Sequence, residues 1–358
     1  MQEIQDDAGT GASPKVAQIF GHSAFEIDFT TALQHGRLHH AWLLTGPRGI
    51  GKAQLALKAA AWLLREEGGQ ALLDDVHSGI DVNENDPGAV LVLRGAHPDM
   101  MLVAPDLEDN KSGQIKINQI RALLPFMMHK PGRGGWRVAI IDSMDEVNRN
   151  GANALLKLLE EPPEKTILFL VSSRPGQLPP TIRSRCRVAR LLPLGDEDSE
   201  RVVQRIWPDA DADQMAILTV LSEGAPGRAT VLAESGAADC YQAACAIIAA
   251  DRLDHPALAA ICGKWGKGGA VGRASRHGAI MLIERMLRLS ALRAAGGATP
   301  ATCAFENRVI DVMCARYLGN TLAKMHSDFS REAARADGLY LDFAQFLMRQ
   351  LAGFHRIS

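Results

Sequence analysis

The sequence predicts an α/β domain built on a parallel sheet, followed by a region of helices alone. Three observations support this fold class. A short apolar run around Leu43-Leu44 leads into a glycine-rich loop and then into a helical pattern. Apolar runs of strand length continue to alternate with helical patterns as far as Leu192, which is typical of a parallel sheet flanked by helices. Beyond Pro193 the strand patterns stop.

The composition is that of a soluble globular protein with more than one domain. The chain has 358 residues, of which 47% are hydrophobic and 22% charged, and this length is too great for one ordinary core. No apolar run approaches the roughly 20 residues that a membrane span needs, and the polar start is no signal peptide. We therefore expect a cytoplasmic protein without membrane contact. The six cysteines show no spacing typical of a metal site or a disulfide framework.

The elements of the first domain can be placed in chain order from their apolar spacing. One or two helices are expected over residues 16–34, before the strand at Leu43-Leu44, and a helix should run from Lys52 to about Arg65. Residues 66–95 break the pattern with glycines and acidic residues, so we interpret them as a polar excursion on the surface. The remaining strands are expected at 100–103, 136–142, 166–171 and 188–192, and the remaining helices at 115–128 and 150–159.

The second half of the chain is expected to be helical. Patterns at 196–207, at 210–221 and from Arg228 onward would make a small helical lid. Three longer amphipathic patterns, at 274–294, 305–325 and 338–354, predict a helical bundle. The apolar faces of residues 280–292 and 339–351 are expected to drive assembly with other chains.

The loop that follows the first strand matches most of a phosphate-binding pattern, G-x-x-x-x-G-K-[ST]. Glycines in such a loop let backbone N–H groups surround a polyphosphate, and the lysine pairs with it. The hydroxyl that ends the pattern, a ligand of Mg²⁺, is replaced by the methyl group of Ala53. A simple glycine turn between a strand and a helix is the alternative. The candidate nucleotide-binding residues of the loop are Gly46, Pro47, Arg48, Gly49, Ile50, Gly51, Lys52 and Ala53.

An acidic residue, Asp142, ends the strand expected at 136–142. Nucleoside triphosphatases with this kind of sheet place there the carboxylate that meets Mg²⁺. The glutamate that would follow and orient the attacking water is replaced by Ser143, and Asp145-Glu146 comes too late unless the strand is longer. Together with Ala53, this predicts a site that does not hydrolyse ATP. Binding of ATP or ADP without turnover stays open, and Mg²⁺ binding is doubtful.

Several short motifs occur together in the first domain. The longest is the run at 153–163, Asn-Ala-Leu-Leu-Lys-Leu-Leu-Glu-Glu-Pro-Pro. The others are His39-His40-Ala41, His97-Pro98-Asp99, Leu178-Pro179 and Ser184-Arg185-Cys186. This set resembles the clamp-loader subunits of the AAA+ class, and among them the family of bacterial DNA polymerase III delta-prime subunits. The resemblance covers about residues 16–250, with only a general helical likeness beyond.

The resemblance implies a division of the chain into parts. After a disordered leader at 1–15, an AAA+ domain with a phosphate-binding loop would occupy 16–192, with an insertion at about 66–97. A helical lid at 193–250 and a C-terminal helical collar at 251–358 would follow. Many members of the family hold zinc with four cysteines in the insertion, but this insertion has none, so no zinc or other metal is predicted. The arginine with which motor subunits sense nucleotide is replaced by Gly227, one place before Arg228.

The resemblance also implies a function and partners. The chain would be a non-hydrolysing stator subunit of a DNA polymerase III clamp loader, which loads the sliding clamp on primed DNA during replication. In this family the arginine of Ser-Arg-Cys, here Arg185, acts in trans in the ATP site of a neighbouring subunit. The implied partners are gamma or tau motor subunits, the delta subunit, the sliding clamp and primer-template DNA bound through its phosphates. Nucleotidyltransferase chemistry would belong to another subunit of the polymerase.

Two alternatives are open at this stage. Arg185 could be an ordinary surface arginine beside Arg183 and Arg187. The chain could also be an active ATPase, either a motor subunit of a clamp loader or another AAA+ enzyme that remodels DNA. Such an enzyme would keep Lys52 and Asp142 as catalytic groups and would need another source for the missing hydroxyl and glutamate.

Overall fold

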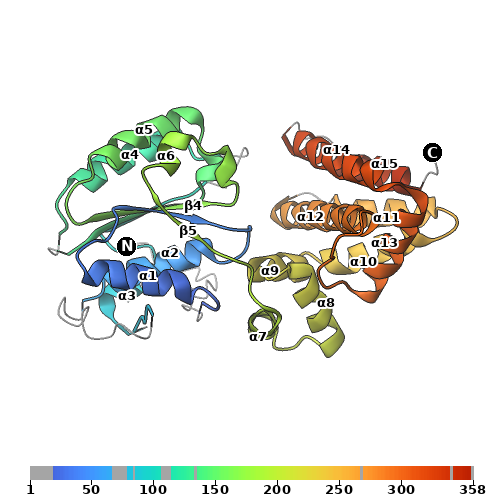
Figure 1. Ribbon diagram of the computed structural model, residues 1–358, viewed down its shortest axis with the longest axis horizontal. Helices are drawn as coiled ribbons and strands as arrows, with labels where there is room; N and C mark the ends of the chain where they lie inside the picture. The colour runs from blue at the N-terminus through green and yellow to red at the C-terminus, as the bar shows by residue number, and fades with distance from the viewer. Residues whose placement is uncertain are drawn as a thin grey trace, which may run out of the picture. The chain divides into compact units, whose positions relative to one another are not determined.

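Figure 1 shows the computed structural model of the chain, which describes residues 19–66, 79–83, 85–105, 114–132, 135–266, 269–338 and 342–355. The chain forms two compact units, one ending at Pro193 and the other beginning at Leu194. In the described part, no helix combines the length and the apolar character that a membrane span needs. The leader predicted at 1–15 lies outside the described residues.

The first unit is built on a sheet of five parallel strands, which confirms the predicted fold class. The strands are β1 (Ala41–Thr45), β2 (Met100–Val103), β3 (Arg137–Ile141), β4 (Thr166–Ser172) and β5 (Arg187–Arg190). Their order in the sheet is β2-β3-β4-β1-β5. β1, β3 and β4 are buried along their whole length, as expected for central strands of a sheet covered on both faces.

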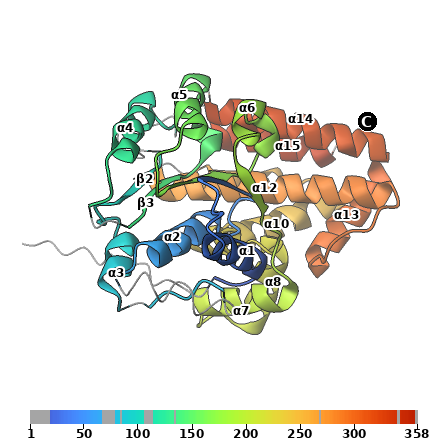
Figure 2. The same cartoon turned by 60° about the vertical axis from the view of Figure 1, so that its left-hand side comes forward.

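Helices cover the two faces of this sheet (Figures 1 and 2). One face carries α1 (Ser23–Gln34), α2 (Lys52–Leu63) and α3 (Pro87–Leu93), and the other carries α4 (Ile117–Met128) and α5 (Arg149–Glu160). Side chains alternate between the faces along a strand. In β1, Trp42 and Leu44 accordingly pack into one core cluster, whereas Ala41 and Leu43 pack into the other. The shorter elements η1 (Met144–Glu146), η2 (Pro175–Gln177) and α6 (Pro180–Arg183) lie between strands in the chain.

The interpretation of residues 66–95 as a surface excursion is wrong for much of the described part. Asp86 caps α3, because its side chain accepts a hydrogen bond from the Ala89 amide at 2.8 Å. Ala89 and Val92 are fully buried, and Ile80 belongs to the same core cluster. A helix of seven residues is too short for its apolar periodicity to stand out among glycines and acidic residues.

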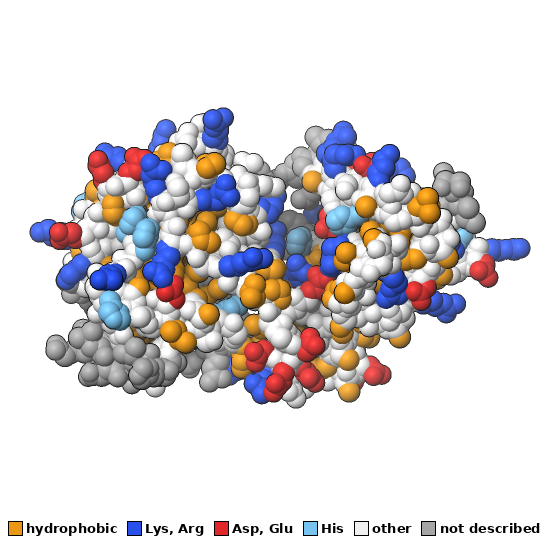
Figure 3. All heavy atoms as spheres, in the orientation of Figure 1, with side chains coloured by type: hydrophobic (Ala, Val, Ile, Leu, Met, Phe, Trp, Pro, Cys, Tyr) orange, Lys and Arg blue, Asp and Glu red, His pale blue; other side chains and the backbone are white. Residues whose placement is uncertain are grey.

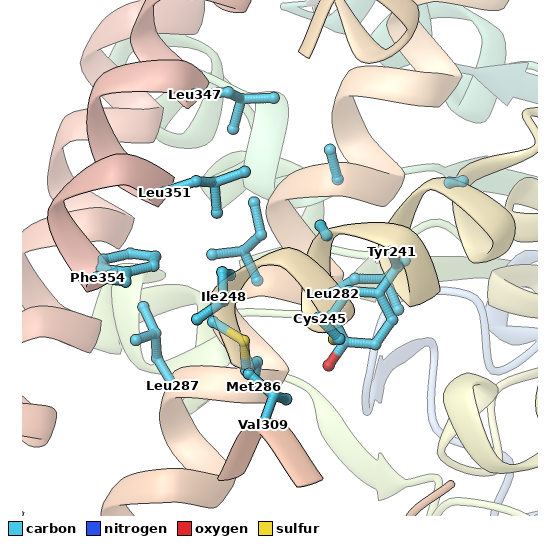
Figure 4. Packing of buried hydrophobic residues seen from close by; sticks show 14 of the residues in the cluster. Tyr241, Cys245, Ile248, Leu282, Met286, Leu287, Val309, Leu347, Leu351 and Phe354 are labelled. Carbon is cyan, nitrogen blue, oxygen red and sulfur yellow. The ribbon is translucent and has the colours of Figure 1, made fainter. Parts of the chain in front are cut away.

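The second unit is helical in its described part, as predicted. Residues assigned to the lid and to the collar share one hydrophobic core, which extends from Val203 to Phe354. Figure 4 shows side chains of this core, among them Tyr241, Met286, Val309 and Leu351. The helices are α7 (Asp196–Ile206), α8 (Ala212–Ser222), α9 (Pro226–Glu234), α10 (Ala237–Ala249), α11 (His255–Trp265), α12 (Gly269–Ala294), α13 (Ala304–Arg316), α14 (Gly319–Gly338) and α15 (Phe343–His355).

Two expectations for this unit are wrong. Residues 305–325 form two helices rather than one, because α13 ends at Arg316 and α14 begins at Gly319. The apolar face of residues 280–292 also packs inside the unit: Leu282, Met286 and Leu287 are buried in its own core. These side chains stabilise the unit itself and are not available for contacts with other chains.

A buried cluster of charged groups crosses the core of the second unit. The Arg285 side chain is 3% exposed and donates to both carboxylate oxygens of Glu306, from Nε at 2.8 Å and from Nη2 at 3.1 Å. Its Nη1 donates to Glu223 Oε1 at 2.6 Å. Tyr241 Oη and the Cys303 amide each donate to Glu306 at 3.0 Å. Because these groups come from four segments, the cluster ties the end of α8 and helices α10, α12 and α13 together.

Candidate functional site

The glycine loop connects β1 to α2. Gly46, Gly49 and Gly51 have φ angles of 152°, 84° and 97°, which lie in the region that favours glycine. At Gly46 a Cβ would also lie 2.5 Å from the Leu191 backbone oxygen. Gly51 is the N-cap of α2, so the unpaired amides of the first helical turn open toward the loop. This geometry can present backbone N–H groups to a phosphate.

Lys52, the first residue of α2, is turned into the protein. The residue is 5% exposed, and its Nζ donates to the Gly46 carbonyl at 2.9 Å, the Pro47 carbonyl at 2.7 Å and Ser173 Oγ at 2.9 Å. An ammonium group has three N–H donors, and these contacts can use all of them. The lysine therefore closes the loop on itself and ties it to the end of β4. To pair with a phosphate, it must exchange at least one of these contacts.

The ends of β3 and β4 bring further polar groups to this carboxyl edge of the sheet. Asp145 accepts hydrogen bonds from Ser172 Oγ at 2.6 Å and from the Ser173 amide at 2.7 Å. Ser173 thereby links Asp145 to Lys52. The sequence patterns did not single out Ser172 and Ser173. Their position at the end of a buried strand was the available signal, because ligands of parallel sheets bind beyond the carboxyl ends of the strands.

Asp142 directly follows β3, and its amide donates to the Val103 carbonyl at 2.9 Å. Burial raises the pKa of its carboxyl, while the charges of Lys52 and Arg48 oppose this rise. The loop cations and Asp142 are therefore close enough to interact at one edge of the sheet. β3 ends at Ile141, and Asp145 lies in η1. The longer strand that would have made Asp145-Glu146 the catalytic pair is not present.

The donor set fits a nucleotide phosphate better than Mg²⁺. Backbone amides of the loop suit phosphate oxygens, whereas Mg²⁺ takes oxygen ligands in octahedral geometry. At the start of α2, Ala53 offers only a methyl group, so Asp142 has no hydroxyl partner there. Among the described residues, no group of three or more His, Cys, Asp or Glu side chains could hold a metal ion.

Arg185 lies at the opposite side of the sheet, toward the amino ends of the strands. It precedes β5 by two residues, and β5 runs parallel to β1 with Arg187 opposite Trp42 and Arg190 opposite Thr45. The loop follows Thr45, so four strand residues, about 13 Å at 3.3 Å each, separate the level of Arg187 from the loop. The predicted loop residues and Asp142 thus come together, whereas Arg185 does not join them.

The surroundings of Arg185 are partly exposed. Its side chain is 36% exposed, and its Nη2 lies 2.9 Å from Glu160 Oε1. Burial raises the pKa of the neighbouring Cys186 thiol to about 12, so this thiol is neutral near pH 7. The ion pair with Glu160 was not predicted, because the two residues are 25 positions apart in the sequence and β4 lies between them.

The motif His97-Pro98-Asp99 has a structural role in the first unit. Asp99 Oδ1 accepts from Arg137 Nη2 at 2.8 Å and from the Gly132 amide at 2.9 Å. The Arg137 side chain is 10% exposed and that of Asp99 3%, so this is a buried pair. It connects the start of β3 to the turn before β2 and to the segment after α4.

The comparisons with known proteins agree with the motifs. Residues 21–195 match the family described as "DNA polymerase III, delta subunit". A DNA polymerase III subunit delta′ of Pseudomonas aeruginosa is 37% identical over 188 residues, which are 52% of this chain and 53% of that protein. The tau subunit of Escherichia coli is 31% identical over 212 residues, 59% of this chain and 31% of its own.

A solved structure of a DNA polymerase III gamma subunit-related protein from Thermotoga maritima aligns with 92% of this chain and 99% of its own. The TM-score is 0.40 and the identity 16%, a likeness too weak to bear on function. This chain spans about half the length of the delta′ protein and less of tau. Residues 21–195 thus match a DNA polymerase III family, and the chain is similar in sequence to delta′ and tau subunits of DNA polymerase III.

Proposed function

We propose that this chain is a non-hydrolysing subunit of a DNA polymerase III clamp loader and presents Arg185 to the ATP site of a neighbouring motor subunit. The observation that carries the proposal is the position of Arg185 across the sheet from its own loop. At that edge a guanidinium acts on a bound nucleotide only when another chain supplies the nucleotide. Such an arginine can accelerate phosphoryl transfer about 10³- to 10⁵-fold.

Three features at the carboxyl edge of the sheet, where the chain's own loop lies, support the absence of hydrolysis. Ala53 lacks the hydroxyl that ligates Mg²⁺, and Ser143 stands where a glutamate would orient water. Lys52 donates to two carbonyls of the loop and to Ser173. The backbone of the loop still has the shape that accepts phosphate, so ATP or ADP would bind there without turnover. No zinc is expected.

The partners follow from the same proposal. Gamma or tau motor subunits, a delta subunit and the sliding clamp would surround this chain, and primer-template DNA would contact it through phosphates. Figure 3 shows acidic side chains gathered over α7, whose first turn holds Asp196, Glu197 and Asp198. This surface repels phosphates, so DNA would contact other parts of the chain. The proposed setting is the cytoplasm.

A second candidate function is an active ATPase subunit of the same loader. Two observations favour it: Lys52 and Asp142 are both retained at the loop, and tau and gamma subunits are among the relatives at 30–33% identity. In that case the variants that matter most would be those of the chain's own loop rather than Arg185.

One experiment separates the two functions. The loader is reconstituted with its motor and delta subunits, and clamp- and DNA-stimulated ATP hydrolysis is compared for wild type, Arg185→Ala and Lys52→Ala. Arg183→Ala is the matched control, because Arg183 is a neighbouring exposed arginine. Far-UV circular dichroism and gel filtration establish that each variant folds and enters the ring.

For a stator subunit, Arg185→Ala removes one neighbour's share of turnover, while Lys52→Ala and Arg183→Ala change it little. The opposite pattern, with Lys52→Ala damaging and Arg185→Ala neutral, would identify a motor subunit and refute the proposal. Binding of ATP by the wild-type chain is measured separately by equilibrium titration, with and without Mg²⁺.

A further inference from the structure

We propose that Glu160 is a positioning residue for Arg185, holding its guanidinium ready for the neighbouring subunit; this inference rests on the proposed function. Arg185 Nη2 lies 2.9 Å from Glu160 Oε1. In addition, Arg185 Nη1 donates to the Thr181 carbonyl at 3.0 Å. Two segments far apart in the chain, the end of α5 and the turn at α6, therefore hold one guanidinium between them.

The end of α5, where Glu160 lies, is held in place by its surroundings. It is the last residue of α5, and Pro162-Pro163 prevents the helix from continuing. The carbonyl of the preceding Leu159 lies 3.0 Å from His40 Nε2, which ties the end of α5 to the start of β1. Three motifs of the sequence, around His40, Glu160 and Arg185, thus meet at the amino edge of the sheet. The negative end of the α5 dipole adds to the attraction for a cation.

Holding the side chain in advance has a physical benefit. A free arginine side chain loses rotamer entropy when it docks on a phosphate, and this loss subtracts from its effect on the transition state. Nη2 pairs with Glu160, whereas Nη1 donates to the Thr181 carbonyl and, at 3.5 Å, to Ser184 Oγ. Within the described part of the chain, Nε–H donates to no acceptor. The held guanidinium therefore keeps donors with which to contact a phosphate.

The size of the effect is limited by exposure. The side chains of Arg185 and Glu160 are 36% and 51% exposed, and solvent-exposed ion pairs contribute at most about 1 kcal/mol, or roughly fivefold in a rate. Removing Glu160 is thus expected to weaken the action of Arg185 and not to abolish it. A Glu160 that instead competed with the phosphate for Arg185 would have the opposite effect, since its removal would raise turnover.

The test uses the reconstituted ring and the variant Glu160→Gln, which keeps the shape and removes the charge. Glu161→Gln is the matched control: it is the next residue, is exposed, and has no ion pair with Arg185. Each variant is also made together with Arg185→Ala. Clamp- and DNA-stimulated ATP turnover is measured as kcat and KM for ATP.

Glu160→Gln is expected to lower kcat about two- to fivefold with little change in KM, and Glu161→Gln to change neither. In the Arg185→Ala background, Glu160→Gln should have no further effect, because it acts only through that arginine. Three results would overturn the inference: an unchanged kcat, a raised kcat, or an equal loss in the Arg185→Ala background, which would mark a merely structural role. An Arg185→Ala ring with full turnover would instead refute the proposed function itself, and this inference with it.

Discussion

The buried ion pair of the second unit offers a quantitative test of how that unit is held together. The change is Arg285→Met, which keeps the length of the side chain and removes its charge. Arg285 is 3% exposed and Glu306 fully buried, so the variant leaves a buried carboxylate without its cation. Breaking a buried pair in this way costs about 3–5 kcal/mol of the free energy of unfolding.

The remaining contacts of the two carboxylates indicate where in this range the loss of free energy of unfolding should lie. Glu306 keeps two donors in the variant, Tyr241 Oη and the Cys303 amide, each at 3.0 Å. Glu223 keeps Arg228, whose Nη1 donates to it at 2.8 Å. We therefore expect a loss near the lower end, about 3 kcal/mol. The double variant Arg285→Met/Glu306→Gln removes the charge that was left unpaired, so it should be less destabilised than the sum of its single changes.

The assay is hydrogen exchange followed by mass spectrometry in increasing urea, because it reports each unit separately. Peptides from α12 and α13 should lose about 3 kcal/mol of protection, whereas peptides from β1 and β4 in the first unit should not change. The matched control is Arg293→Met on the same helix. Its side chain and that of its partner Asp311 are 29% and 68% exposed, so less than about 1 kcal/mol should be lost. A loss below about 1 kcal/mol for Arg285→Met would refute the reasoning.

Three further predictions concern the first unit. Burial lowers the pKa of His40 and of His97, so below about pH 7 the unfolded chain binds more protons than the folded chain. The melting temperature of the first unit should therefore drop as the pH is lowered toward 5. Replacing either histidine with alanine should make this pH dependence weaker. Gly46→Ala should lower the free energy of unfolding by about 2 kcal/mol or more, since φ is 152° and a Cβ would lie 2.5 Å from a backbone oxygen. The measurement is a urea titration. The control is Gly176→Ala, where a Cβ would have no atom within 4 Å and the loss should be much smaller. Ala53→Thr should raise the affinity for ATP several-fold only when Mg²⁺ is present, as measured by titration, and the appearance of ATP hydrolysis would contradict the role assigned to the missing glutamate.

Local patterns in the sequence determined much of the first unit. The glycine loop, the helix that begins at Lys52 and the acidic residue after β3 are each encoded within a few neighbouring residues, because turn chemistry, helix periodicity and strand burial are local properties. The short helix α3 was not predicted, because its apolar residues span less than two turns. The break between α13 and α14 at Tyr317-Leu318 was not predicted either, because the helical spacing of apolar residues continues across it.

The tertiary structure alone decided which distant groups meet. Lys52 contacts Ser173 across 121 positions of sequence, and Arg185 contacts Glu160 across β4. The pair Arg285–Glu306 joins two helices of the second unit. Such contacts depend on the order of the strands and on which helix faces pack, and neither is visible in the spacing of residues along one element. The sequence by itself therefore determined the loop, the acid and the arginine as candidates, while only the folded chain placed the arginine at the other edge of the sheet.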